Sequence, residues 1–260
     1  MKNELLTIGP FTVYGYGLMI GIGVIAAYLT AEMRAKKQGL DNGERVFSLV
    51  IWCVIGGILG AKLLYLITQY REILADPAEI FRDFADGFVV YGGIFGGILA
   101  GWLYCRVLKL PFLKYFDLVM PSIALAQGFG RIGCFLAGCC YGQPTNSCIG
   151  ITFTDSAYAP NGVALIPTQL ISSALDSLHF GLLLFLARKC KADGQVAGFY
   201  LVFYSAGRFV LEFFRGDLVR GSVGALSTSQ FISIFTFFAG IIMVVCLGRR
   251  RAISAEDESH

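Results

Sequence analysis

The strongest constraint on the fold is a series of seven mostly apolar stretches along the 260-residue chain. Each stretch is close to the roughly 20 residues that a helix needs to cross the hydrocarbon core of a bilayer. The predicted spans are residues 12–33, 46–69, 88–107, 115–137, 168–188, 195–214 and 227–248. The sequence therefore indicates an all-α integral membrane protein with seven transmembrane helices, which we expect to form a single polytopic domain over residues 1–260.

The composition supports a membrane protein over a soluble one. Hydrophobic residues make up 56% of the chain and charged residues 15%, with a mean hydropathy of +0.67. An average soluble domain has about 25% charged residues. The formal net charge of +3 is too small to indicate a nucleic-acid partner. The first 11 residues lack the basic start of a signal peptide and no cleavage site follows, so we expect the first span to be retained.

Lysine and arginine are distributed unevenly between the loops on the two sides of the spans. They concentrate after the first, third and fifth spans and in the C-terminal tail, which predicts that these segments are cytoplasmic and that the N-terminus lies outside. Two long loops would also face outside. Residues 70–87 have the spacing of an amphipathic interfacial arm, and residues 138–167 contain no lysine or arginine, as a substrate-handling loop could.

Three basic residues interrupt the apolar spans, namely Lys62, Arg131 and Arg208. A cation in the hydrocarbon costs roughly 2.5–3.5 kcal/mol on insertion scales, so such residues are candidates for function. Arg131 and Arg208 both lie toward the outer ends of their spans, and a guanidinium binds phosphate through a planar fork. We therefore predict that they converge on one lipid phosphate. The alternatives are snorkelling to the interface, or an ion pair between Arg208 and Glu212.

Two further patterns place polar or small residues on helix faces. Tyr204, Arg208 and Glu212 follow one another at intervals of four, which puts all three on one face of a helix. Glycines recur at small-xxx-small spacing in residues 55–60 and 91–101, which indicates close helix packing. The alternative to helix packing for the second glycine segment is that residues 91–93 line a ligand site.

Four of the eight cysteines cluster near the predicted outer face, namely Cys134, Cys139, Cys140 and Cys148. Buried cysteines often act as small hydrophobes, and these match no strong zinc spacing, although a redox pair or a soft-metal site is an alternative. Cys134 follows Arg131 by three residues, so we expect it to line the same cavity. No hydrolase serine motif or dinucleotide fingerprint is present. We therefore expect no cofactor and no metal.

The same residues carry a resemblance to a known family. "GRIGCFLAGCCYG", residues 130–142, resembles the signature of the prolipoprotein diacylglyceryl transferases. "YGYGLMIGIG" near the start, "VVYGGIFGG" in the third span and "PTQL" at the fifth are similar to other elements of that family. "YSAGRFVLEFFRGD", residues 204–217, and "STSQFISI" resemble its last conserved segments. The order and spacing of these elements agree over nearly the whole chain.

The resemblance implies an activity, two substrates and a location. This family transfers a diacylglyceryl group from phosphatidylglycerol to the lipobox cysteine in the signal peptide of a prolipoprotein, which gives a thioether and glycerol 1-phosphate. It implies a multi-pass protein of the bacterial cytoplasmic (inner) membrane. By position it implies catalytic roles for Arg131, Arg208 and Tyr91. It implies substrate-binding roles for Tyr16, Lys62, Gly92, Gly93, Cys134, Cys139, Gly142, Tyr204 and Glu212.

The signature also departs from the family pattern. Cys134 and Ala137 stand where asparagines are usual, and Cys139 stands where a glutamate is usual. Tyr91 occupies a position that is often histidine, and Lys62 one that is often arginine. Two alternatives therefore stay open beside the transferase: a divergent paralogue with other lipid-dependent or thiol redox chemistry, and an anion transporter.

Overall fold

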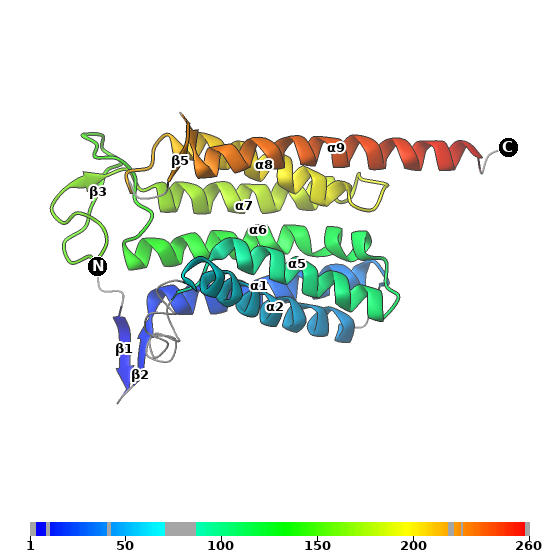
Figure 1. The fold of residues 1–260 in the computed structure, drawn as a ribbon, viewed down its shortest axis with the longest axis horizontal. Helices are drawn as coiled ribbons and strands as arrows, with labels where there is room; N and C mark the ends of the chain where they lie inside the picture. Colours follow the sequence, from blue (N-terminus) through cyan, green and yellow to red (C-terminus); the bar gives the residue numbers. More distant parts are fainter. Residues whose placement is uncertain are drawn as a thin grey trace. The chain divides into compact units, whose positions relative to one another are not determined.

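The computed structural model describes residues 4–8, 11–40, 43–70, 87–217, 221–224 and 226–257, so most of the predicted arm at residues 70–87 lies outside the described residues. Within this part the chain forms seven helices, which confirms the all-α fold class (Figure 1). They are α1 (Gly15–Lys37), α2 (Glu44–Thr68), α5 (Val90–Val107), α6 (Phe112–Ala137), α7 (Thr168–Leu186), α8 (Gln195–Glu212) and α9 (Thr228–Asp257). All except α8 are long and apolar enough to cross a membrane.

Short antiparallel strand pairs accompany the helices. They are β1 (Glu4–Ile8) with β2 (Phe11–Tyr14), β3 (Ile151–Thr152) with β4 (Ala164–Leu165), and β5 (Ser222–Val223) with β6 (Leu226–Ser227). The first predicted span therefore began too early, because residues 12–14 belong to β2 and α1 starts at Gly15. Thr12, Val13 and Tyr14 are β-branched or aromatic residues, which favour a strand where a pairing partner is available.

The chain divides into two compact units, one of residues 1–30 and 116–260 and one of residues 31–115. In the second unit α2 and α5 pack through glycines. A side chain at Gly60 or Gly92 would meet the backbone oxygen of the other residue, and the same holds between Gly56 and Gly96. The small-xxx-small spacing in the sequence thus allows the two backbones to approach closely. The single-domain organisation of the whole chain stays a prediction.

In the first unit α8 packs between α7 and α9 (Figure 1). Its contact with α9 depends on small residues, because Gly198 and Gly240 each lie against the backbone of the opposite helix. Its contact with α7 contains a buried core that includes Leu183, Ala197 and Tyr200. The two faces of α8 are therefore both occupied by helix neighbours, which fixes the direction of the side chains near its C-terminal end.

A carboxylate from α6 holds the start of α8. Asp117 accepts hydrogen bonds from the backbone N–H groups of Gly194, at 2.7 Å, and Ala197, at 2.8 Å. These groups have no partner within the helix at its first turn, and a negative charge is favourable at the positive end of the helix dipole. Asp117 thus sets the position of α8 relative to α6 within the first unit.

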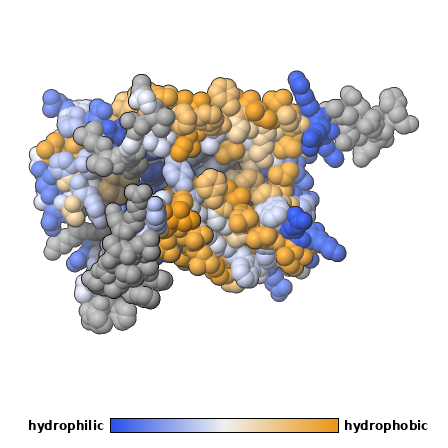
Figure 2. Space-filling view, viewed as in Figure 1, coloured by the Kyte–Doolittle hydropathy of each residue, from blue (hydrophilic) through white to orange (hydrophobic). Residues whose placement is uncertain are grey.

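The outward sides of the helices are apolar. Leu178 on α7 is 69% exposed, and Phe235 and Ile242 on α9 are each 61% exposed. Figure 2 shows such hydrophobic side chains, in orange, over much of the helical surface. Monomeric soluble proteins rarely expose large contiguous apolar patches, and a lipid environment covers this kind of surface.

The loop of residues 138–167 is tied to the ends of two helices. Gly142 donates its backbone N–H to Ile166 at 3.0 Å and forms an isolated bridge with Arg215, just after α8. Phe153 and Leu165 bury a small core within the loop together with Phe135 of α6. The predicted polar loop is therefore a folded segment that surrounds the ends of α6, α7 and α8.

Candidate active site

Arg131 of α6 and Arg208 of α8 line one cavity of about 180 Å³ in the first unit. Matching depths in the sequence predicted this convergence. Tyr204 and Asp176 add polar groups to the wall, and the rest is largely apolar, with Leu175, Leu178, Leu182, Phe203 and Leu211. The cavity thus offers positive charge on one side and hydrocarbon on the other, which suits an amphipathic ligand with an anionic group.

Arg131 is positioned without a tight partner from the protein. Among the described residues, no hydrogen bond or ion pair reaches its guanidinium. Its electrostatic neighbours are Tyr204, Cys134, Cys140 and Asp176. A guanidinium keeps its charge in essentially all protein environments and presents five donors. The donors of Arg131 are therefore available to an anion in the cavity.

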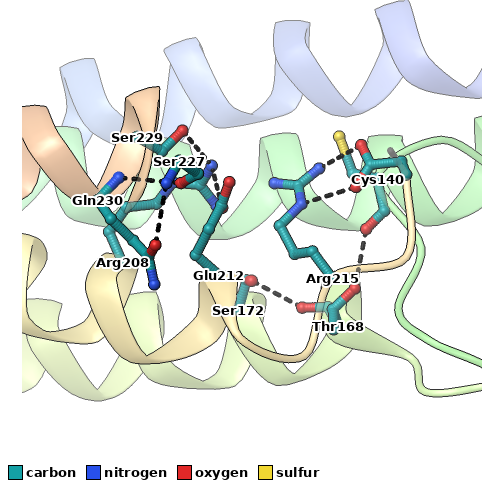
Figure 3. Close-up of polar contacts among 10 residues, drawn as sticks. Cys140, Thr168, Ser172, Arg208, Glu212, Arg215, Ser227, Ser229 and Gln230 are labelled. Carbon is teal, nitrogen blue, oxygen red and sulfur yellow. Dashed lines mark hydrogen bonds and ion pairs between the residues drawn. The ribbon is translucent and has the colours of Figure 1, made fainter. Parts of the chain in front are cut away.

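Arg208, in contrast, is held by its own helix and by the next one (Figure 3). A terminal nitrogen of Arg208 lies 2.7 Å from a carboxylate oxygen of Glu212, an ion pair one helical turn further along α8. Another contact is the hydrogen bond that the same nitrogen donates to the hydroxyl of Ser229 on α9, at 2.9 Å. The predicted i,i+4 pair with Glu212 and the shared cavity with Arg131 thus occur together, although the sequence presented them as alternatives.

Ser229 is itself positioned by the cap of α9. Ser227 and Gln230 exchange side-chain to backbone hydrogen bonds, each at 3.1 Å, in the reciprocal pattern of a capping box. This cap fixes the first turn of α9, where Ser229 lies (Figure 3). The "STSQ" segment therefore defines where the last helix starts and also supplies a partner to Arg208.

Tyr204 belongs to a column of aromatic rings, of which Tyr204 and His179 line the cavity. It stacks on Tyr200, with ring centroids 5.6 Å apart, and Tyr200 stacks on His179 of α7 at 5.2 Å. The hydroxyl of Tyr200 donates to Gln127 of α6 at 2.9 Å. These contacts link α6, α7 and α8, the three helices that carry the cavity.

Two ionisable residues of the cavity were not among the predicted site residues. Asp176 and His179, three residues apart on α7, both line it and are both buried. The ring nitrogen Nε2 of His179 is buried without a hydrogen-bond partner among the described residues. The signal was available, because Asp176 is an ionisable residue within a predicted span and such residues are functional candidates by default.

The cysteines form a separate group beside Arg131. The sulfur atoms of Cys134, Cys139 and Cys140 all lie within 4.8 Å of one another, which defines what we call the thiol cluster. The residues that line the arginine cavity in the described structure do not include Cys134, and its role at the site stays a prediction. The helix α6 ends at Ala137, and the turn that follows brings two more thiols to Cys134.

Hydrogen bonds and charge organise the thiol cluster. Hydrogen bonds from the thiols of Cys134 and Cys139, and then the charge of Arg215, lower the pKa of Cys140. Figure 3 shows Arg215 beside Cys140. Arg215 is held in turn by two hydrogen bonds to Asp217, at 2.9 and 2.7 Å. Tyr16 of α1 is an electrostatic neighbour of the same three cysteines. The cluster therefore lies in a positively charged setting.

The remaining predicted residues are Gly142 in the first unit and four residues of the second unit. Gly142 lies in the loop bridge to Arg215, where a side chain would collide with Ile166. Lys62 and Tyr91, as well as Gly92 and Gly93, belong to the second unit. The Lys62 ammonium lies 5.1 Å from the ring centroid of Tyr65, and Tyr91 is 40% exposed at the start of α5. The roles that the resemblance implies for these residues stay predictions.

The helices and the site define a class of protein: a polytopic membrane protein with a two-arginine cavity between helices. The sequence profile of the family described as prolipoprotein diacylglyceryl transferase matches residues 3–246. A phosphatidylglycerol–prolipoprotein diacylglyceryl transferase of Clostridium tetani (strain Massachusetts / E88) is 49% identical over 243 residues, which cover 94% of this chain and 96% of the relative. The chain belongs to the prolipoprotein diacylglyceryl transferase family.

Other relatives support the same assignment. The phosphatidylglycerol–prolipoprotein diacylglyceryl transferase 2 of Clostridium perfringens (strain 13 / Type A) is 50% identical over 243 residues, covering 94% of each chain. A relative with the same enzyme name from Finegoldia magna is 33% identical over 241 residues, covering 90% of this chain and 93% of its own length. The similarity thus extends over nearly the full length of all three relatives.

Proposed function

We propose that this chain transfers a diacylglyceryl group from phosphatidylglycerol to the lipobox cysteine of a prolipoprotein. A carbon–sulfur bond forms at the glyceryl carbon, the carbon–oxygen bond to the phosphate breaks, and glycerol 1-phosphate leaves. Family membership and the printed names of the relatives support this reaction. The single observation that carries the proposal is the cavity that Arg131 and Arg208 line together.

The two arginines have different tasks in this scheme. Arg208 is already paired with Glu212 and Ser229, so it presents a fixed direction to the cavity. Arg131 has free donors within the described structure and can bind the lipid phosphate through two of them. As the carbon–oxygen bond breaks, negative charge grows on the phosphate oxygens. Two guanidiniums that line the same cavity stabilise that charge more than they stabilise the bound lipid.

The apolar wall of the cavity is suited to the diacylglyceryl part of the lipid. Leu175, Leu178 and Leu182 lie on one face of α7, and Leu178 is also largely exposed on the outside of the helix. Acyl chains of phosphatidylglycerol can therefore extend from the cavity into the surrounding bilayer. The arrangement favours a lipid donor over a free phosphorylated sugar or alcohol, which would leave this wall uncovered.

The orientation in the membrane follows the distribution of basic residues. With the basic loops in the cytoplasm of a bacterium, the C-terminal ends of α6 and α8 face outward across the cytoplasmic membrane. Arg131 and Arg208 then lie in the outer half of the bilayer. A lipobox cysteine that emerges on that side, at the end of a signal peptide, reaches the cavity from the same leaflet as the lipid.

Activity of the purified full-length protein tests the proposal. In nanodiscs that contain phosphatidylglycerol, a prolipoprotein peptide should gain the mass of a diacylglyceryl group while glycerol 1-phosphate is released. Arg131→Gln should lower kcat/KM by at least about 100-fold, the typical cost of removing one transition-state donor. Arg188→Gln, in the loop between α7 and α8, is the matched control and should leave kcat/KM unchanged.

Two outcomes would contradict the proposal. One is full activity in nanodiscs that contain only phosphatidylethanolamine, because its headgroup gives a different leaving group. The other is an Arg131→Gln variant that folds normally, as judged by its melting temperature, and transfers lipid as fast as the Arg188→Gln control.

A further inference from the structure

The thiol cluster has the dimensions of a metal site. A zinc ion binds thiolate sulfur at about 2.3 Å in a tetrahedron, so ligand sulfurs lie about 3.8 Å apart. The three sulfurs of Cys134, Cys139 and Cys140 are already within 4.8 Å of one another. Small side-chain rotations, without a change of fold, would bring all three to one ion.

The backbone around the cluster is built to hold this arrangement. Gly138 and Cys140 adopt left-handed backbone angles, with φ of 75° and 61°, and this turn folds the chain back toward Cys134. Gln169 donates to the carbonyl of Cys139 and Thr168 donates to the carbonyl of Cys140, each at 2.8 Å. A non-glycine residue rarely adopts such an angle, and at Cys140 the surrounding hydrogen bonds keep it there.

The charges around the cluster also fit a bound ion. Three thiolates with one Zn²⁺ carry a net charge of −1. Arg215 lies beside Cys140, and Arg131 is an electrostatic neighbour of Cys134 and Cys140. These two guanidiniums can compensate the negative charge of the complex. Half-buried anions of this kind need such partners, because burying an unpaired charge is costly.

Three ligands leave one position of the tetrahedron open. Structural zinc sites have four protein ligands, whereas catalytic ones have three and an exchangeable fourth ligand. All three cysteines are partly accessible, and none of the other groups that could bind a metal in the described residues joins the cluster. In the reaction proposed above, the acceptor is itself a thiol, and a thiol that coordinates Zn²⁺ is deprotonated.

We propose that Cys134, Cys139 and Cys140 bind a Zn²⁺ ion whose fourth ligand is the acceptor cysteine of the substrate. This inference rests on the proposed function. The acceptor thiol loses its proton to solvent when it binds the ion, and its thiolate sulfur then attacks the glyceryl carbon. The carbon–oxygen bond breaks with its electron pair going to the phosphate oxygen. Glycerol 1-phosphate leaves as the dianion, and the ion keeps its charge of +2 throughout.

The position of the cluster fits this step. Arg131 belongs to the wall of the arginine cavity and is at the same time a neighbour of Cys134 and Cys140. A lipid phosphate on Arg131 would therefore place the reacting glyceryl carbon near the ion. The departures from the family signature at Cys134 and Cys139 thus replace an amide and a carboxylate with ligands for a thiophilic metal.

Metal binding is tested on the purified full chain without any activity measurement. The reduced protein is loaded with Zn²⁺ and then desalted, and the bound zinc is measured by mass spectrometry. We expect one ion per chain, and at least a tenfold lower content in Cys139→Ser and Cys140→Ser. Cys148→Ser and Cys246→Ser remove exposed cysteines outside the cluster and should retain the ion. Wild-type protein without bound zinc, or a Cys139→Ser variant that binds it equally well, overturns the proposal.

The open position is tested with Co²⁺ in place of Zn²⁺, since its absorption spectrum reports thiolate ligands. A lipobox peptide should add one thiolate ligand to the spectrum, and the same peptide with Cys→Ser should not. An unchanged spectrum with the cysteine peptide overturns the assignment of the fourth ligand.

Activity separates this inference from the proposed function. Removal of the ion by a chelator should lower lipid transfer at least tenfold, and Zn²⁺ should restore it. Full transfer by the metal-free protein overturns the zinc inference and leaves the transferase function intact. Bound zinc and a responsive Co²⁺ spectrum with no lipid transfer under any condition overturn the proposed function instead.

Discussion

The guanidinium of Arg208 on α8 donates a hydrogen bond to the hydroxyl of Ser229 on α9 at 2.9 Å. This contact fixes the direction of Arg208 toward the cavity that it shares with Arg131. Ser229 lies in the first turn of α9, so the cap formed by Ser227 and Gln230 also positions the cationic wall of the cavity. A helix start that looks purely structural therefore contributes to the candidate site.

The first prediction concerns this contact. Ser229→Ala should lower kcat/KM for lipid transfer about 10- to 150-fold, because hydrogen bonds to charged groups contribute about 1.5–3 kcal/mol. Steady-state kinetics with phosphatidylglycerol measures the effect. Ser147→Ala, in an exposed turn of the loop after α6, is the control and should change nothing. Equal kinetics for the two variants would show that Ser229 does not orient Arg208.

The second prediction tests whether Arg208 acts through its positive charge alone or also through the planar shape of its guanidinium. Arg208→Lys keeps the positive charge beside Glu212, but a lysine cannot contact Glu212, Ser229 and a phosphate with a planar fork. We expect kcat/KM to fall about 10- to 100-fold while the melting temperature changes little. Arg249→Lys at the exposed end of α9 serves as the matched control. A fully active Arg208→Lys variant would contradict the prediction that activity requires the planar guanidinium of Arg208.

The third prediction concerns the acidic residue in the cavity wall. Asp176 lines the same cavity as Arg131 and is one of its electrostatic neighbours. A carboxylate there repels the phosphate of the lipid, so Asp176→Asn should lower KM for phosphatidylglycerol a few-fold by removing a like charge. Asp193→Asn, in the exposed turn before α8, should leave KM unchanged. A raised KM in Asp176→Asn would mean that the carboxylate orients Arg131 instead.

The fourth prediction separates packing from binding in the second unit. A methyl group at Gly92 would collide with the backbone of Gly60, whereas one at Gly93 would be about 3.4 Å from the oxygen of Gly57, an ordinary contact. Gly92→Ala should therefore lower the melting temperature clearly in detergent, and Gly93→Ala should not. Activity of the Gly93→Ala variant then tests its implied binding role. A large loss of lipid transfer at an unchanged melting temperature would support that role.

The helices could be predicted from the sequence because every segment that crosses a lipid bilayer has to meet the same requirement. Backbone groups in the hydrocarbon must be hydrogen-bonded within the segment, so about 20 apolar residues indicate a helix whatever the neighbours are. All seven predicted spans overlap helices, including α8, which is not apolar enough to stand out by composition alone. The strand at residues 11–14 was not foreseen, because its formation depends on pairing with residues 4–8.

The site was only partly predictable from the sequence. Helical spacing correctly joined Arg208 with Glu212, because that relation lies within one helix. The partners Ser229 and Asp176 come from other helices, and no spacing rule relates them to Arg208 or Arg131. The same rule predicted that Cys134 lines the cavity, but it did not predict that the turn after α6 brings Cys139 and Cys140 close to Cys134. Contacts between helices and loops therefore determine the parts of the site that helical periodicity within one segment could not predict.

The pair of Arg208 and Glu212 has a consequence for how the protein is made. During synthesis α8 emerges before α9, so Ser229 does not yet exist when α8 enters the membrane. An unpartnered arginine costs roughly 2.5–3.5 kcal/mol on insertion. Glu212 lies on the same helix and can neutralise that charge at once. The one described helix that falls short of a membrane span by length and composition therefore carries its own counter-ion into the bilayer. The contact with Ser229 forms later, when α9 has been made.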